Sequence, residues 1–383
     1  MKIVYCLPQI YHAGGIERIV ITKANYFADV CGWEVTIITT EQKGEASYYK
    51  LSPKISVIDL DLDYENLTRK SLLHRIIGKY YLSNKHKKKL KKVLMRLRPD
   101  ITISTYTNEV AILCGIKDGS KKILETHFSR HFRIVYSKLK RRSYLYCLML
   151  RLKEYYDIKF IIPRYDKFVV LTEEDKKNWN QDVDNVISIP NMLTLSNPLQ
   201  SNCMNKKVIA VGHLDINKGF DRMILLWKDI VKKTQGWQLH IYGEGEEKSN
   251  LINMINTLDL KESVLIHEPS KEIALRYKES SLLIMTSKSE GRPLVITEAM
   301  QCGVPVVCYG FKCGPKDIIT NGEDGFVIEE NNHREFVDKV VYLLNNNEQR
   351  VIMGKKASIN IQRFSAENIM PKWCSLFKDI VKK

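Results

Sequence analysis

Two glutamates, Glu290 and Glu298, flank an Arg-Pro pair in the stretch SEGRPLVITEAMQCGVPVV, residues 289–307, which lies between two apolar runs. Proline is favoured in the first turn of a helix, so we expect a helix to begin near Pro293. The backbone N–H groups at such an end, together with the helix dipole, attract an anion. Glu298, about one turn further on, can accept hydrogen bonds from two neighbouring hydroxyls, and Glu290 can contact a polar ligand group. The alternative is that both are solvated acids.

A second candidate lies in VGHLDINKGFD, residues 211–221, where a strand end, a glycine and a loop lead to Lys218 before another expected helix. A lysine there can neutralise a phosphate as a point charge. The alternative is an ordinary exposed lysine. The stretch FKCGPKDIITNGEDG, residues 311–325, offers a further helix start after Gly314. Each signal is weak alone, but several glycine-marked strand ends in one half of the chain together predict a site for an anionic ligand.

Two glycine pairs mark further strand ends. In IYGEGEEKSNL, Gly243 and Gly245 predict a tight turn near a nucleobase or ribose, although a plain turn fits equally well. In YHAGGIERIV, Gly14 and Gly15 allow the backbone to approach a ligand closely. Neither pair completes the GxGxxG fingerprint of dinucleotide sites. We therefore expect no dinucleotide in the first half of the chain.

The stretch ILETHFSRHF ends another strand-like run in the first half. We expect Glu125, His127 and Arg130 to be exposed there, toward the same ligand as the residues above. A histidine at a strand end can hydrogen-bond a sugar hydroxyl or a phosphate. The alternative is a surface histidine or one satisfied inside the protein.

The elements that must position these residues follow one pattern along the whole chain. Apolar, strand-like runs alternate with longer, helix-like periodic segments, from KIVYCL near the start to GFVIEE near residue 330. This alternation predicts parallel sheets with helices on both faces. The polar, turn-rich stretch 191–207 is the expected linker. The predicted class is therefore α/β, with two doubly wound, Rossmann-like domains facing each other across a cleft and ligands outside the carboxyl ends of the strands.

Bulk composition excludes several classes of protein. The 383 residues suffice for two or three domains, and 44% hydrophobic residues suffice for real cores. No apolar run is long enough to span a membrane, and the N-terminus lacks the features of a signal peptide. The nine cysteines lack paired or zinc-like spacing, which indicates reduced thiols in a cytoplasmic protein without a metal site.

The charge is uneven. Residues 1–200 hold 34 Lys and Arg against 21 Asp and Glu, a net +13, whereas residues 201–383 hold 26 against 23, a net +3. The first half therefore suits an anionic partner, either nucleic acid or a membrane surface. Two basic stretches, 85–98 and 138–156, favour the membrane, and no nucleic-acid-binding signature is present. The alternative for residues 85–98 is that their apolar stripe packs on a sheet and leaves the lysines solvated.

Taken together, these stretches resemble the family-4 retaining glycosyltransferases, which have the GT-B fold. SEGRPLVITEAMQCGVPVV is similar to the family's E-x7-E signature, and the Gly-Gly loop, the Glu-x-His run, VGHLDINKGFD, LHIYGEGEE and CGPKDIITNGEDGFVI follow in the family's order. The resemblance covers nearly the whole chain. It implies an acceptor-binding domain over 1–195, a nucleotide-sugar-binding domain over 196–365 and a C-terminal helix, 366–383, that crosses back to the first domain.

The resemblance also implies roles for single residues. Lys218 would bind the donor diphosphate, Glu298 the ribose hydroxyls and Glu290 the donor sugar, while His127 would lie at the reacting sugar. His127, Glu290 and Lys218 are thus the expected catalytic residues. The other positions expected to contact substrates are Gly14, Gly15, Glu125, Gly212, His213, Gly243, Gly245, Gly291, Arg292, Pro293, Leu294 and Glu298. Members of this family need no metal and no cofactor.

Two positions depart from the family pattern. His213 stands where a phosphate-binding arginine is usual, and Arg292 stands where an apolar aromatic is usual. Arg292 is therefore a candidate to replace the missing phosphate contact.

The leading hypothesis is a cytoplasmic, peripheral inner-membrane enzyme. It would transfer a hexose or N-acetylhexosamine from a UDP-sugar to a polyprenyl-diphosphate-linked or glycan acceptor, forming an α-linkage in the synthesis of a bacterial surface polysaccharide such as capsule or lipopolysaccharide. Its partners would be the UDP-sugar, the acceptor and an anionic membrane surface, with no nucleic acid. Two rival classes are a nucleotide-cofactor oxidoreductase or epimerase on the same sheets, and a basic nucleic-acid-binding protein.

Overall fold

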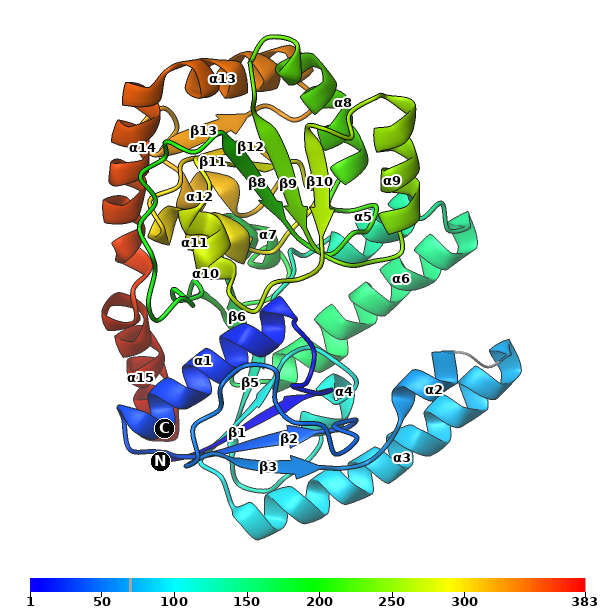
Figure 1. Ribbon diagram of the computed structural model, residues 1–383. Coiled ribbons are helices and arrows are strands. Elements are labelled where there is room, and N and C mark those ends of the chain that lie inside the picture. Colours follow the sequence, from blue (N-terminus) through cyan, green and yellow to red (C-terminus); the bar gives the residue numbers. More distant parts are fainter. Residues whose placement is uncertain (69–70, 383) are drawn as a thin grey trace. The chain divides into compact units, whose positions relative to one another are not determined.

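The chain divides into two compact units, and the computed structural model describes residues 1–68 and 71–382 (Figure 1). The first unit comprises Met1–His127, Arg151–Asn191 and Ile369–Lys383, and the second comprises Phe128–Leu150 and Met192–Asn368. The predicted domain ranges differ from these units chiefly in assigning residues 128–150 to the first domain. Those ranges remain our proposal for the domain boundaries.

The first unit is built on a seven-stranded parallel sheet in the order β3-β2-β1-β4-β5-β6-β7. Its order around β1 and β4 is that of doubly wound folds. Every strand from β1 to β7 lies within an apolar run predicted from the sequence. The strands are β1 (Lys2–Leu7), β2 (Glu34–Thr39), β3 (Ser56–Asp59), β4 (Ile101–Ser104), β5 (Lys121–Glu125), β6 (Lys167–Val170) and β7 (Val186–Ser188).

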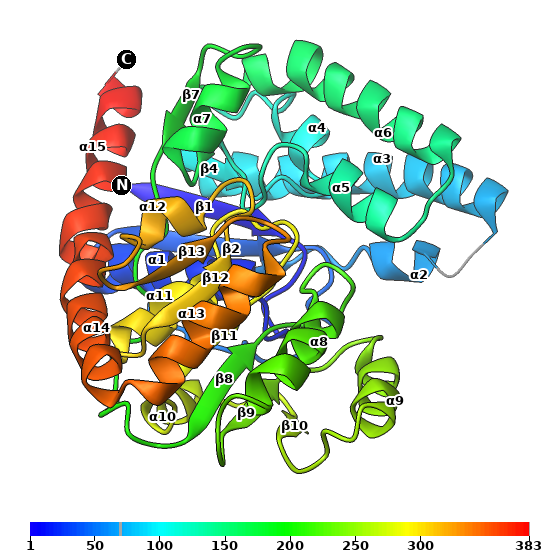
Figure 2. The ribbon, with the colours of Figure 1, turned by 90° about the horizontal axis from the view of Figure 1, so that it is seen from above.

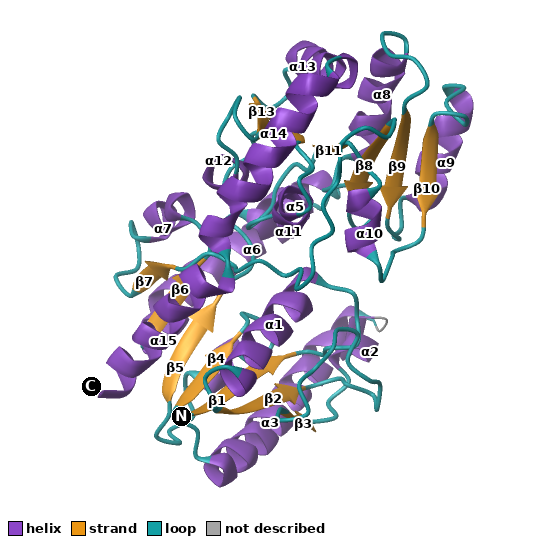
Figure 3. Cartoon of the chain, turned by 60° about the vertical axis from the view of Figure 1, so that its left-hand side comes forward, coloured by secondary structure: helices purple, strands orange, loops and turns teal. Residues whose placement is uncertain are grey.

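Helices cover both faces of this sheet, and α1 and α3 lie on opposite faces (Figure 3). Leu90 and Leu94 of α3 are fully buried in the core, so the apolar stripe of the basic stretch 85–98 packs inside the unit. The helices are α1 (Gly15–Asp29), α2 (Tyr64–Thr68), α3 (Leu72–Leu97), α4 (Val110–Leu113), α7 (Glu173–Trp179) and α15 (Ala366–Lys382), with a π-helical turn at Asp157–Ile161 and a 3₁₀ turn at Ile162–Arg164.

The C-terminal helix α15 packs against α1 in the first unit. The ring of Phe377 lies 5.3 Å from that of Phe27, and Trp373 and Phe377 are both almost fully buried. This apolar face explains why residues from Ile369 onward belong to the first unit although the chain reaches them only after the second.

The second unit contains a six-stranded parallel sheet in the order β10-β9-β8-β11-β12-β13. Counted within the unit, this order is 3-2-1-4-5-6, the doubly wound arrangement of the Rossmann fold. The strands are β8 (Lys207–Val211), β9 (Gln238–Tyr242), β10 (Val264–His267), β11 (Leu282–Met285), β12 (Val306–Tyr309) and β13 (Gly325–Ile328). The buried runs Leu282–Met285 and Val306–Tyr309 are apolar on both faces because helices cover both sides of the sheet.

One face of this sheet is covered by α8 and α13, which pack against each other (Figure 2), and the other by α10 and α11. The helices are α8 (Phe220–Val231), α9 (Lys248–Thr257), α10 (Ile273–Lys278), α11 (Leu294–Gln301), α12 (Pro315–Ile318), α13 (His333–Asn345) and α14 (Asn347–Asn360), followed by a 3₁₀ turn at Ile361–Phe364. Two further helices, α5 (Phe132–Leu139) and α6 (Tyr144–Tyr156), lie between β5 and β6 in the sequence. The predicted α/β class with two Rossmann-like sheets is confirmed.

Within the described ranges, 1–68 and 71–382, none of the helices has the length and apolar character needed to cross a lipid bilayer.

Candidate functional site

The predicted donor residues of the second unit gather where its strand order reverses. β8 is hydrogen-bonded to β9 on one side and to β11 on the other, so the connections after β8 and after β11 leave the sheet in opposite directions. Ligands of doubly wound sheets bind at this point, outside the carboxyl ends of the strands. The loop after β8 carries Lys218, and the loop after β11 carries Glu290.

Asp215 shapes the loop after β8. Its Oδ1 accepts hydrogen bonds from the backbone N–H groups of Asn217, at 2.9 Å, and of Lys218, at 3.1 Å. Gly219, the N-cap of α8, has φ +66°, and a β-carbon there would lie 2.4 Å from the carbonyl oxygen of Thr286. Only glycine fits this left-handed, crowded position. The loop is thus held close to the end of β11.

The loops after β8 and β11 are tied together by two residues that sequence reasoning missed. The side-chain amide of Asn217 donates to the carbonyl of Ser289 at 2.8 Å. The guanidinium of Arg222 donates to the carbonyls of Thr286 and Ser287 at 2.6 and 2.8 Å. Backbone carbonyls carry no sequence signal, so neither contact could have been read from the sequence.

These ties bring the two expected catalytic groups of the second unit into direct contact. Nζ of Lys218 lies 2.6 Å from Oε1 of Glu290, and the two side chains remain 21% and 16% exposed. A ligand can therefore reach both the cation and the carboxylate. The pair places a group suited to phosphate beside a group suited to a hydroxyl.

Glu298 is held deeper, in α11. The residue is 2% exposed, its Oε1 accepts a hydrogen bond from Thr194 Oγ1 and its Oε2 accepts one from Tyr277 Oη, both at 3.1 Å. Two donors fix the plane of the carboxylate, and each oxygen keeps a further lone pair for a ligand hydroxyl. Tyr277, a fully buried residue of α10, was not predicted from the sequence.

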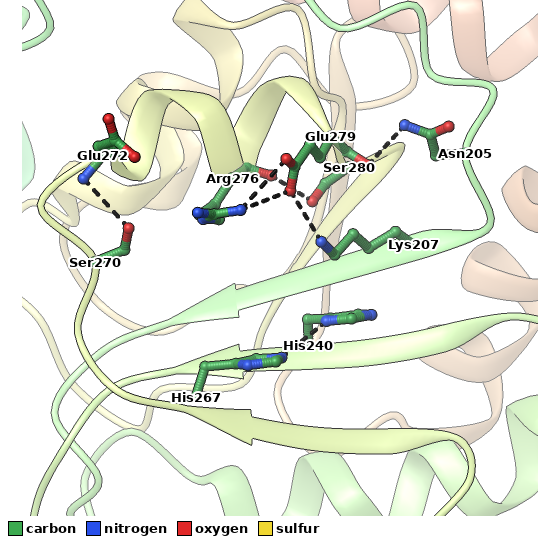
Figure 4. A network of polar contacts seen from close by, with 9 residues as sticks. All are labelled: Asn205, Lys207, His240, His267, Ser270, Glu272, Arg276, Glu279 and Ser280. Carbon is green, nitrogen blue, oxygen red and sulfur yellow. Dashed lines mark hydrogen bonds and ion pairs between the residues drawn. The ribbon is translucent and has the colours of Figure 1, made fainter.

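A polar network anchors α10, and with it Tyr277, to the sheet (Figure 4). Glu279, which follows α10, accepts hydrogen bonds from Lys207 of β8 at 3.1 Å and from Arg276 of α10 at 3.1 Å. Beside them, His240 and His267 form a 2.9 Å hydrogen bond between their rings. Burial lowers the pKa of His240 to about 4, so that ring is neutral at pH 7.

Chain packing accounts for Gly243 and Gly245. A β-carbon on Gly243 would lie 1.9 Å from the carbonyl oxygen of Gly212, and one on Gly245 would lie 2.4 Å from that of Leu214. The loops after β8 and β9 therefore touch backbone to backbone. This contact favours the plain-turn interpretation of both glycines, while it also shapes the loop that carries Lys218.

Arg292 makes an internal contact. The residue is 5% exposed, and its guanidinium carbon lies 4.0 Å from the centre of the Phe364 ring. Burial lowers the pKa of Arg292 to about 9, so the group is still charged at pH 7 and stacks as a cation on the ring. This stacking favours a structural role over the phosphate contact considered from the sequence. His213 is exposed, and Pro293 is the N-cap of α11 with Leu294 as its first residue.

In the first unit, the predicted glycines lie at the start of α1, next to the end of β1. Gly14 is the N-cap and Gly15 the first helical residue. Glu17, in the first turn, accepts a hydrogen bond from the side chain of Gln9 at 2.7 Å. Burial raises the pKa of Glu17, which the hydrogen bonds only partly offset. The β1–α1 loop is therefore shaped by a side-chain bond as well as by its two glycines.

The expectation that Glu125 and His127 are exposed was wrong. Glu125 at the end of β5 is fully buried and forms an ion pair with Lys23 of α1, which is 1% exposed and lies over the ring of Trp373. Nε2 of His127 lies 3.4 Å from Oε1 of Glu125, and the His127 side chain is 5% exposed. A carboxylate next to α1 is drawn inward by the only kind of partner that offsets its desolvation, a buried cation.

This burial sets the charge of His127. Burial lowers the pKa of His127 to about 4, and Lys23 lowers it further, against the opposing effect of Glu125. The imidazole is therefore neutral at pH 7 and can accept or donate a hydrogen bond at either nitrogen. Oε2 of Glu125, Nε2 of His127 and Oη of Tyr5 are buried without a hydrogen-bonding partner, which marks the cluster as a place for a bound water or hydroxyl.

Another hollow in the first unit is chemically unsuited to an anion. It has a volume of about 410 Å³ and is lined by Glu41, Lys43, Asp59, Asp61, Asp63, Glu65 and Asn66. Five carboxylates would repel a diphosphate. Among residues 1–68 and 71–382, no three His, Cys, Asp or Glu side chains gather in a way that could hold a metal ion.

Comparison with solved structures defines the class of protein. The chain superposes on Staphylococcus aureus TarM, solved with UDP, Fondaparinux and α-GlcNAc-glycerol, with a TM-score of 0.80 and 19% identity over 98% of this chain and 99% of that one. Sucrose-phosphate synthase from Thermosynechococcus elongatus gives a TM-score of 0.81 at 16% identity, over 99% of this chain and 98% of that one. The two doubly wound sheets are thus those of the GT-B glycosyltransferase fold.

Sequence comparison then gives the family. Residues 193–359 match the model of the group 1 glycosyl transferases. An uncharacterized glycosyltransferase of Haemophilus influenzae is 31% identical over 97% of this chain and 98% of its own length. The chain therefore belongs to the group 1 glycosyl transferases and is a glycosyltransferase. A Campylobacter jejuni relative, 24% identical over 99% of both chains, is named GalNAc-α-(1→4)-GalNAc-α-(1→3)-diNAcBac-PP-undecaprenol α-1,4-N-acetyl-D-galactosaminyltransferase.

Proposed function

We propose that the protein is a retaining, family-4 glycosyltransferase that moves a hexose or N-acetylhexosamine from a UDP-sugar to a glycan acceptor and forms an α-linkage. The observation that carries the proposal is the contact between Lys218 and Glu290 at the switch point of the second sheet, with the oriented carboxylate of Glu298 in the adjoining helix. UDP in the TarM structure supports the choice of donor.

In this proposal Lys218 and the backbone N–H groups at the starts of α8 and α11 face the diphosphate. They stabilise the negative charge that develops on UDP as the glycosidic C–O bond breaks. Glu298 accepts hydrogen bonds from the ribose hydroxyls, and Glu290 accepts one from the donor sugar. The residues Gly212, His213, Gly291, Arg292, Pro293 and Leu294 belong to the two loops that would surround the donor.

The transition state in this proposal is oxocarbenium-like. The acceptor oxygen attacks the anomeric carbon from the face that UDP leaves, its proton passes to the departing phosphate oxygen, and the configuration is retained. His127, neutral and close to Glu125, hydrogen-bonds a hydroxyl of the reacting sugar. Gly14 and Gly15 approach the diphosphate and the acceptor.

The proposed acceptor is a polyprenyl-diphosphate-linked sugar or a growing polysaccharide of the bacterial surface. The undecaprenol-diphosphate glycan in the name of the Campylobacter relative supports this choice. Such an acceptor stays at the membrane, so we propose that the enzyme is cytoplasmic and binds the inner membrane peripherally. Its net charge of +16 suits an anionic bilayer.

The rival classes receive no support from a second observation. Membership in the glycosyl transferase family favours sugar transfer over hydride transfer or epimerisation, and over nucleic-acid binding.

The test is turnover of a panel of UDP-hexoses and UDP-N-acetylhexosamines by the purified protein, with the anomeric configuration of the product read by NMR. We expect one UDP-sugar to be consumed with an α-linked product, and Glu298→Ala to reduce its turnover by about 100-fold or more. A β-linked product would refute retention. Wild-type turnover in Glu298→Ala would refute the site.

A further inference from the structure

Helix α6 turns an apolar face to the solvent. Leu145, Leu148, Met149, Leu152 and Tyr156 follow a spacing of i, i+3, i+4, i+7 and i+11, so they share one side of a helix. Their exposed fractions are 66%, 37%, 60%, 60% and 53%. Large apolar side chains at this exposure on a single helix face form a patch of the kind that marks an interaction surface.

The opposite side of α6 is the one that faces the protein. Cys147 is buried, and Leu150 and Glu154 are half-buried. The helix therefore directs a glutamate inward and its leucines outward, the reverse of an ordinary surface helix. Figure 1 shows α6 as one continuous helix, so the outward face is a single stripe.

Tyrosines lie at both ends of this stripe. Tyr144 and Tyr146 near the first turn are 80% and 46% exposed, and Tyr155 in the last turn is 59% exposed. Phe160, in the following turn, is 50% exposed. Tyrosine is favoured where one end of the ring is in apolar surroundings and the hydroxyl is in water, as at the boundary between lipid headgroups and acyl chains.

The charges around α6 suit an anionic surface. Residues 138–164 contain eight Lys and Arg and two acids, a net +6. One of these acids, Asp157, is occupied by Lys153, whose Nζ lies 2.7 Å from its carboxylate. Basic residues that flank an apolar stripe attract anionic lipid headgroups while the stripe enters the acyl region.

We propose that α6 is the element that docks the enzyme on an anionic lipid bilayer, with Leu145, Leu148, Met149 and Leu152 inserted below the headgroups. A second copy of this chain is a poorer occupant, because two surfaces of net +6 would repel each other. The basic stretch of α3 differs from α6, since its apolar residues Leu90 and Leu94 are used inside the core.

This inference deepens the proposed function by naming the membrane contact, but its test needs neither donor nor acceptor. Failure of vesicle binding would leave sugar transfer untouched, and failure of sugar transfer would leave vesicle binding untouched.

The first experiment is flotation of the purified protein with phosphatidylcholine vesicles, with and without phosphatidylglycerol. We expect binding to the anionic vesicles, weakened about tenfold or more in the variant Leu145→Ser/Leu148→Ser/Met149→Ser/Leu152→Ser. The matched control is Leu225→Ser/Ile252→Ser/Ile359→Ser, which changes exposed apolar residues on α8, α9 and α14 and should bind like wild type. Equal binding of the two variants would overturn the proposal.

The second experiment keeps the apolar face and reports its depth. Tryptophan at position 149, in Met149→Trp, should lose fluorescence with vesicles of brominated lipids, whereas Ile359→Trp should not. Equal quenching, or none, would overturn the proposal. A dimer that the serine variant of α6 abolishes, without vesicle binding by wild type, would instead assign the face to a second copy of the chain.

Discussion

Lys218 and Glu290 are 72 positions apart in the sequence, yet Nζ of Lys218 lies 2.6 Å from Oε1 of Glu290. The contact exists because β8 and β11 are neighbours in the sheet, and because Asn217 and Arg222 hold the loops that follow them. It joins a phosphate-binding cation and a sugar-binding carboxylate in one loop pair. The first prediction concerns this pair.

Lys218→Ala should reduce kcat/KM for the UDP-sugar by about 100-fold or more, because it removes a cation that stabilises the departing diphosphate. Steady-state kinetics checks the effect. Lys232→Ala, which changes an exposed lysine at the other end of α8, is the control and should behave like wild type. If both variants kept full activity, Lys218 would have no part in transfer.

Tyr277→Phe should raise KM for the UDP-sugar about tenfold, because Glu298 loses one of the donors that orient its carboxylate. It should also narrow the preference for the UDP-sugar over its 2′-deoxyribose analogue, since Glu298 is proposed to bind the ribose hydroxyls. The ratio of the two kcat/KM values measures this. Tyr342→Phe, at an exposed tyrosine, is the control. An unchanged ratio in Tyr277→Phe would separate Tyr277 from ribose binding.

His127 should titrate at a pKa of about 4, well below the ordinary value for histidine, because it is buried and lies near Lys23. Lys23→Met should raise that pKa by about one to three units, since Glu125 then acts on the imidazole alone. NMR titration of the imidazole protons measures both. Lys2→Met, at an exposed ion pair with Glu34, is the control. A wild-type pKa of His127 near 6.5 would contradict the buried cluster.

The same shift makes stability depend on pH. As pH falls below about 6.5, the unfolded chain takes up a proton at His127, while the folded chain does so only near pH 4. The stability that the neutral imidazole contributes is therefore present above that range and is lost as pH falls through it. Denaturant midpoints should decrease from pH 7 to pH 5, and less steeply in His127→Asn. Parallel slopes would contradict the assignment.

Gly243→Ala should lower the free energy of unfolding by about 2 kcal/mol or more, because its β-carbon would lie 1.9 Å from the backbone oxygen of Gly212. It should weaken UDP binding as well, since the displaced loop carries Lys218. Urea unfolding and calorimetry check the two effects. Gly115→Ala, where the nearest atom is 3.6 Å away, is the control and should be nearly neutral. Equal stability of the two variants would contradict the backbone contact.

The strands of both sheets could be predicted because each is a short apolar run between turns. β11 and β12, for example, are buried along their whole length. Glycine-marked strand ends likewise predicted the loops with Lys218 and Glu290. Periodicity alone left the stripe of 85–98 open, because a face packed on a sheet and a face on a membrane look the same. The structure buries Leu90 and Leu94 and exposes the face of α6 instead.

The partners of the site residues could not be predicted, because they depend on contacts between distant parts of the chain. Tyr277 reaches Glu298 only because α10 and α11 share one face of the sheet. Lys23 is an unremarkable lysine in the sequence, and its ion pair with Glu125 exists only once α1 lies next to the end of β5. For the same reason Glu125 and His127 were expected to be exposed and are buried.

Hydrogen exchange of the backbone amides, measured with and without UDP, tests the central claim most directly. UDP should slow exchange in residues 212–219 and 286–301, the loops and helix starts around Lys218 and Glu290, and should leave the acidic hollow near residues 59–66 unchanged. Bound UDP that slows exchange only outside those two segments would contradict the account.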